Sequence, residues 1–119
     1  MIVINIGVEG MIHAVNEVEA AIIVTTGDLV KGICDASTNM PTVQTLIVVC
    51  YDRIDQQAIS KSSISLTKSE DVEKAGRQSN NNVELDASLT RGDLAIIMYT
   101  SGSTGNYTLF ILISGDLML

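Results

Sequence analysis

The chain has 119 residues, of which 46% are apolar and 18% charged, so it can fold as one domain or as part of a larger one. A net charge of −7 disfavours binding to nucleic-acid phosphates or to anionic membranes, and 3% aromatics offer few platforms for base stacking. No stretch reaches the ~18 apolar residues of a transmembrane segment, and the N-terminal residues lack the basic segment of a signal peptide. The composition therefore predicts a soluble, cytoplasmic globular protein with no nucleic-acid partner.

The first fifty residues alternate between helical and strand patterns. Apolar residues recur at helical spacing over 9–20, and a β-branched run follows at once over 21–25. A shorter helical pattern spans 29–34, and a second apolar run spans 43–50. Both apolar runs are continuous, which favours strands buried on both faces. This alternation with short connections predicts an α/β fold, in which helices cover a parallel sheet.

The middle of the chain has weaker patterns. Residues 51–63 are polar and predict a loop, whereas residues 64–66 predict a short strand. Residues 70–76 predict one or two helical turns that end at Gly76. Residues 77–91 have no apolar period, so we expect an exposed connector there.

Isolated polar residues give no strong sign of a catalytic or metal site. Cys34 and Cys50 lack the paired spacing of a zinc site, which favours two buried free thiols over a disulfide. His13 has no evident nucleophile or orienting carboxylate, so a structural role on the first helix is favoured. The acidic residues between 52 and 73 fit neither an EF-hand nor a carboxylate pair and predict a solvated surface. We therefore predict no catalytic residue and no metal ligand.

One segment carries a dense chemical signal. The predicted buried strand 93–99 runs into six consecutive residues that are only glycine, serine or threonine: Thr100, Ser101, Gly102, Ser103, Thr104 and Gly105. Glycines let backbone N–H groups approach a ligand, and hydroxyls add donors for phosphate oxygens. Ligands of α/β proteins bind beyond the carboxyl ends of strands, where this segment is expected. The pattern predicts a phosphate-binding loop, although a flexible turn between strands has the same composition. Neither GxxxxGK[ST] nor GxGxxG is present.

The string DLAIIMYTSGSTGN, residues 93–106, closely resembles the phosphate-loop signature of the adenylate-forming superfamily, the AMP-dependent synthetases and ligases. Residues 9–30 and 40–49 are similar to the long-chain fatty acyl-CoA synthetases of that superfamily. The resemblance implies a fragment of the doubly wound, mainly parallel sheet of the family's large N-terminal domain. It also implies a partial AMP-binding domain over 1–106 and a non-matching tail over 107–119.

The same resemblance implies a long-chain fatty-acid–CoA ligase of the AMP-forming type. Such an enzyme uses ATP and Mg²⁺ to convert a fatty acid to an acyl-adenylate and then transfers the acyl group to coenzyme A. The six loop residues from Thr100 to Gly105 match those that hold the β- and γ-phosphates of ATP, and Tyr99 matches the residue that enters this loop. In the family the enzyme works at the endoplasmic reticulum and other membranes.

The match is lost after Asn106. The family continues with Pro, Lys and Gly, whereas this chain has Tyr107, Thr108 and Leu109, so the cation expected beside the phosphates is missing. The family's later motifs are also absent from these 119 residues. We therefore expect an incomplete and inactive fragment with an altered tail. The alternative is a non-catalytic nucleotide-binding or regulatory α/β module.

Overall fold

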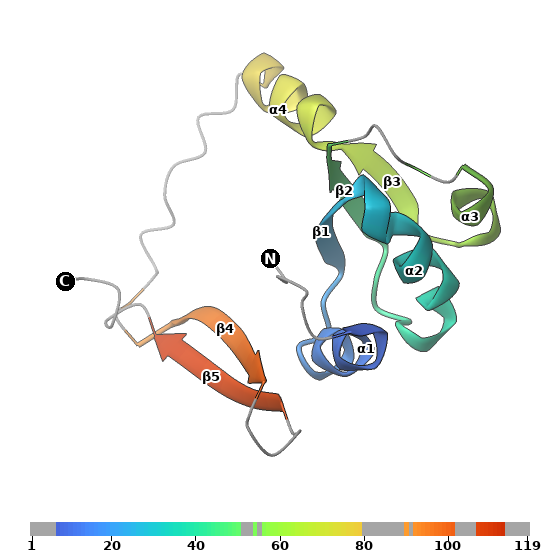
Figure 1. The fold of residues 1–119 in the computed structure, drawn as a ribbon. Helices are drawn as coiled ribbons and strands as arrows, with labels where there is room; N and C mark the ends of the chain where they lie inside the picture. The colour runs from blue at the N-terminus through green and yellow to red at the C-terminus, as the bar shows by residue number, and fades with distance from the viewer. Residues whose placement is uncertain are drawn as a thin grey trace. The chain divides into compact units, whose positions relative to one another are not determined.

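The structure is a computed structural model that describes residues 7–50, 54, 56–79, 90, 92–101 and 107–113. The chain divides into two compact units, Met1–Asn80 and Asn81–Leu119. All described helices lie in the first unit (Figure 1). Within the described residues, none of the helices has the length and apolar character required to cross a bilayer.

The first unit is built around a three-stranded parallel sheet. Its strand order is β1-β2-β3, with Ile22 aligned with Thr45 and Thr45 aligned with Ser65. The elements follow in the order α1 (Gly7–Glu17), β1 (Ile22–Thr26), η1 (Gly27–Leu29), α2 (Val30–Asp35), η2 (Ser37–Asn39), β2 (Thr45–Val49), α3 (Gln56–Lys61), β3 (Ser65–Lys68) and α4 (Ser69–Gln78). Helices alternate with parallel strands, so the predicted α/β class is confirmed.

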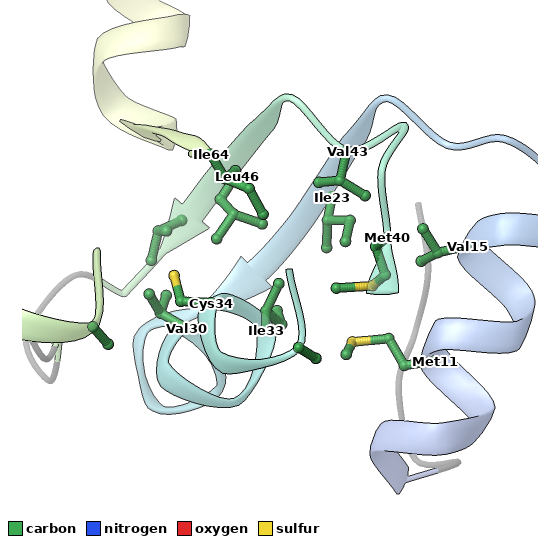
Figure 2. Close-up of a cluster of buried hydrophobic side chains, with 13 residues drawn as sticks. Met11, Val15, Ile23, Val30, Ile33, Cys34, Met40, Val43, Leu46 and Ile64 are labelled. Atoms are coloured by element: carbon green, nitrogen blue, oxygen red, sulfur yellow. The ribbon is translucent and has the colours of Figure 1, made fainter. Parts of the chain in front are cut away.

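One face of the parallel sheet carries the hydrophobic core. Ile23 and Leu46 project from β1 and β2 toward α2, where Ile33 lies against them (Figure 2). Met40 fills the space between this cluster and α1, whose Met11 and Val15 are 2% and 0% exposed. The α1 and α2 helices are therefore held by apolar contacts with one shared core.

The opposite face of β1 and β2 is more exposed than the sequence predicted. Ile22 and Val49 are 54% and 40% exposed, and Val24 and Ile47 are only half-buried. Side chains alternate between the two faces of a strand, so a continuous apolar run makes both faces apolar without ensuring that both are covered. The expectation that these strands are buried on both faces is wrong.

The α1 helix ends earlier than residue 20, at a Schellman motif. Glu19 adopts a left-handed backbone with φ of 50°. Its N–H donates to the Asn16 carbonyl oxygen at 3.3 Å, and the Ala20 N–H donates to the Val15 carbonyl oxygen at 3.0 Å. These two bonds define the motif and satisfy carbonyls at the helix end. A glutamate thus occupies the position that glycine usually takes.

The predicted loop over 51–63 contains a helix, so this part of the prediction is wrong. Helix α3 spans Gln56–Lys61 and is anchored by Ala58, which is 8% exposed, while Ile54 and Ile59 pack against the core. These three apolar residues are too few to produce a clear helical period in a polar segment.

Two predictions around β3 have different outcomes. The short strand is confirmed as β3, but α4 continues through Gly76 to Gln78, so the expected stop at that glycine is wrong. Glu70 and Asp71 lie in the first turn of α4 and Arg77 in the last, an arrangement that favours the helix dipole. The expected connector therefore begins after the helix, and residues 80–89 of it lie outside the described part of the chain.

The second unit contains an antiparallel hairpin. Strand β4 (Leu94–Ser101) pairs with β5 (Tyr107–Ile113), from Leu94 opposite Ile113 to Ser101 opposite Tyr107. The strand predictions over 93–99 and 107–113 are confirmed. The expectation that the first is buried is wrong, since Leu94, Ile96 and Met98 are 57%, 42% and 51% exposed.

Candidate functional site

The glycine- and hydroxyl-rich segment begins inside a strand. Thr100 and Ser101 are the last two residues of β4, where they pair with Thr108 and Tyr107 of β5. Gly102, Ser103, Thr104 and Gly105 lie outside the described residues. The connection between the paired strands is residues 102–106, a length typical of a hairpin loop.

Pairing of the two strands sets the distance that the connection spans. Opposed residues of an antiparallel pair have Cα atoms ~4.5–5.5 Å apart, and Ser101 opposite Tyr107 is the last such pair before the loop. Both ends of the loop are therefore attached to an ordered hydrogen-bonded ladder. The strand prediction over 107–113 did not include its pairing with β4, although two strand patterns joined by a short glycine-containing segment are typical of a hairpin.

A compact turn precedes β4. The Thr90 N–H donates to the Asp93 carboxylate, and the Gly92 N–H donates to Thr90 Oγ1 at 3.3 Å. The Asp93 N–H donates in turn to the Thr90 carbonyl oxygen at 3.2 Å. These local bonds define where the strand begins, eight residues before the loop is reached.

The chemistry available at the loop is that of neutral donors. No lysine or arginine follows Arg91 in the sequence, so backbone N–H groups and hydroxyls are the groups that this segment offers to an anion. Such donors bind phosphate oxygens well when glycines allow close approach. They provide no full positive charge, so a polyphosphate would be bound with its own counter-cation.

The other candidate residues do not form a second site in the described part of the chain. His13 Nε2 lies 3.5 Å from a Glu17 carboxylate oxygen, but the side chains are 62% and 41% exposed on the surface of α1. The expectation that His13 has no carboxylate at hand is wrong, since Glu17 lies four residues further along the same helix. Among the described residues, no three His, Cys, Asp or Glu side chains are grouped as metal ligands.

The two cysteines have different environments. Both thiols are free, which confirms that they form no disulfide with each other. Cys34 belongs to α2 and is buried in the core, whereas Cys50 is exposed, so the prediction of two buried thiols is wrong for the second. Cys50 follows the last residue of β2 with a left-handed φ of 58°, which places it beyond the packed strand.

The described residues form an α/β fold, and the glycine- and hydroxyl-rich segment connects β4 to β5. The family model described as AMP-binding enzyme matches residues 2–107, which include this loop and both sheets up to the start of β5. The chain therefore belongs to the AMP-binding enzyme family, within the adenylate-forming superfamily.

Comparison with a curated relative supports the same assignment. The chain is 26% identical over 104 residues to long chain acyl-CoA synthetase 8 of Arabidopsis thaliana. The match covers 85% of this chain but only 14% of the plant protein. This chain thus corresponds to a small part of that relative's length.

Solved structures confirm the fold. The adenylation domain of a carboxylate reductase from Mycobacterium chelonae superposes with a TM-score of 0.73 at 18% identity, covering 96% of this chain and 20% of that one. A carboxylic acid reductase didomain from Segniliparus rugosus, solved with AMP, gives 0.72 at 17% identity, covering 92% and 17%. The α/β architecture is that of part of an adenylation domain, as the sequence predicted.

Proposed function

We propose that this chain supplies the ATP-phosphate loop of an adenylate-forming ligase that activates a carboxylic acid. The observation that carries the proposal is the family match over 2–107, which contains the loop joining β4 and β5. Thr100, Ser101, Gly102, Ser103, Thr104 and Gly105 would hold the β- and γ-phosphates through backbone N–H groups and hydroxyls. Residues 1–106 would form the AMP-binding part, and residues 107–119 the segment that departs from the family sequence.

The proposed reaction has two steps. A carboxylate oxygen attacks the α-phosphorus of ATP, and the bond to pyrophosphate breaks, leaving an acyl-adenylate. The sulfur of coenzyme A then attacks the acyl carbonyl carbon, the thiol proton leaves, and AMP departs as the thioester forms. Holding the β- and γ-phosphates orients the leaving group of the first step.

The substrate is proposed from the relatives. The plant relative is named a long chain acyl-CoA synthetase, and this supports the proposal that a long-chain fatty acid and coenzyme A are substrates. The solved neighbours are named for carboxylic acid reduction, so a carboxylic acid is the class common to both comparisons. Mg²⁺ is proposed as part of the ATP substrate complex, because the resemblance of the loop to the adenylate-forming superfamily implies it.

A second function is a nucleotide-binding module without catalysis. It is favoured by Thr108, which stands where the family sequence has a lysine, because a cation near the phosphates stabilises the departing pyrophosphate. In this case ATP would bind at the loop, but acyl-adenylate would not form.

ATP–pyrophosphate exchange with a C16 or C18 fatty acid tests the proposed activity and separates the two functions. Exchange of labelled pyrophosphate into ATP, dependent on fatty acid, supports the ligase, whereas ATP binding without exchange supports the module. Absence of both contradicts both functions. Gly105→Val is the loop variant, and Gly92→Val in the turn before β4 is its control, since a Cβ there meets only Thr90 Oγ1, at 3.8 Å.

A further inference from the structure

The edges of the two sheets differ in how well they are protected against pairing with another strand. Within the described residues, the parallel sheet ends in β1 and β3, and the hairpin consists of β4 and β5 alone. An edge strand presents unpaired N–H and C=O groups, which form a template for another strand. Proteins suppress such pairing with short edges, lysines, prolines and bulges.

Three of these edges carry at least one such feature. Strand β3 has four residues, includes Lys68 and leads directly into α4. Strand β1 has only five residues. Strand β4 contains a register shift between Leu94 and Ile96, where Ala95 is an additional residue without a partner in β5.

Strand β5 has none of these features that suppress pairing. It is seven residues long, YTLFILI, and contains no charged residue, no proline and no glycine. The extra residue of the register shift belongs to β4, so β5 is regular along its length. An uncharged run of this length and β-propensity is the type of segment that pairs with copies of itself.

We propose that β5 is a self-association surface, on which the β5 strand of a second copy pairs antiparallel to give a four-stranded sheet β4-β5-β5-β4. The interface is isologous, because the same strand contributes from both copies. A chain of net charge −7 repels its copies in general, but antiparallel pairing places β5 against its own reversed sequence, where no charge meets another. Four strands also form a more stable sheet than an isolated two-stranded hairpin.

In this dimer the loop that joins β4 and β5 stays accessible. Residues 102–106 lie at one end of β5, and antiparallel pairing puts the loops of the two copies at opposite ends of the shared sheet. Self-association is therefore independent of the nucleotide-binding proposal. Pairing along one seven-residue edge buries a small area compared with the ~1,600 Å² of a typical stable interface. Association is therefore expected only at micromolar or higher concentrations of the chain.

Phe110, at the centre of β5, is the position to change. In a symmetric pair its two copies lie opposite or nearly so, and Phe110→Lys would oppose two like charges. We expect the dissociation constant of the dimer to rise ~tenfold in Phe110→Lys, because the variant loses the pair of aromatic side chains and also sets two like charges opposite each other. Val72→Lys is the matched control, since it makes the same change on α4, where the side chain is 44% exposed.

Sedimentation equilibrium of the full chain tests the proposal. The concentration should run from about 10 to 500 μM, because so small an interface is expected to dissociate in this range. The expected result is a monomer–dimer equilibrium for the natural chain and Val72→Lys, and a dissociation constant ~tenfold higher for Phe110→Lys and Phe110→Glu. Mixing the last two should restore dimers, because lysine then faces glutamate, and a folding defect would not be rescued in this way. The proposal would be overturned if the natural chain stays monomeric or assembles beyond the dimer. It would also be overturned if Phe110→Lys associates as the natural chain does, or if mixing the two variants does not restore dimers.

Discussion

Thr25 provides a sharp test of how the parallel sheet is packed. Its side chain projects from β1 into the core face and is 7% exposed, and its strand neighbour in the register is Val48, which is 1% exposed. Among the described residues, Thr25 Oγ1 is the buried side-chain polar atom without a hydrogen-bond partner. Replacing threonine with valine keeps the shape of the side chain and its β-branching, but removes this hydroxyl.

The expected gain follows from the cost of the hydroxyl. A buried polar group without a partner costs ~1–3 kcal/mol, and the methyl group that replaces it adds apolar burial. Part of this gain is lost wherever the new methyl is tightly packed. Thr25→Val should therefore raise the free energy of unfolding by ~1–2 kcal/mol.

Urea unfolding followed by circular dichroism at 222 nm measures this change, since the described helices all belong to the first unit. With a slope of ~1–2 kcal/mol/M, the midpoint should rise by about 1 M without a change of slope. Thr26→Val, at the exposed next residue, is the control and should change stability by less than ~0.5 kcal/mol. An unchanged or lower midpoint for Thr25→Val, or an equal rise in the control, would refute the reasoning.

Three further predictions concern the helix end, the core and the loop. Glu19→Gly should raise the free energy of unfolding by ~0.5–1 kcal/mol in the same urea assay, because glycine adopts the left-handed conformation without strain. Glu19→Ala is the control: it loses the same charge and should not raise the free energy of unfolding. Leu46→Ala should lower the free energy of unfolding by ~3 kcal/mol, because Leu46 is buried in the core. Val49→Ala, at a side chain that is 40% exposed, should lower it by less than ~1 kcal/mol, and equal losses in the two variants would contradict a core on one face of the sheet. Thr108→Lys, at the position paired with Thr100, should tighten ATP binding ~tenfold by calorimetry, an effect that added salt should weaken. Thr108→Gln should leave the affinity unchanged, and an equal gain in this variant would exclude a charge effect.

The first half of the fold was predictable because its signals are local. The apolar run at 21–25 overlaps β1 and the run at 43–50 contains β2, and the helical pattern between them favours a parallel arrangement with a crossover helix. How far each face is covered depends on distant segments, and for this reason the exposure of Ile22 could not be derived. Helix α3 was missed because its contact with the core depends on very few residues, chiefly Ala58.

The candidate site was predictable in composition but not in context. The residues from Thr100 to Gly105 are identifiable because a run of only glycines and hydroxyls is rare and has a clear chemical use. That the first two of them belong to β4 could not be derived, because the strand is extended by pairing with Thr108 and Tyr107 across the loop. The register of a strand pair is set by its hydrophobic pattern and turn geometry, and the continuous apolar runs at 93–99 and 107–113 do not specify how far the pairing extends into the loop.

The central claim is that the loop between β4 and β5 binds the β- and γ-phosphates of ATP. Calorimetric titration of the full chain with Mg·ATP and with AMP, for the natural protein and for Gly105→Val and Gly92→Val, tests it most directly. We expect ATP to bind more tightly than AMP. Gly105→Val should lose at least ~tenfold in ATP affinity, because its side chain blocks close approach of the backbone, whereas Gly92→Val should bind ATP as the natural chain does. Equal affinity for ATP and AMP, or unchanged ATP binding in Gly105→Val, would contradict the claim.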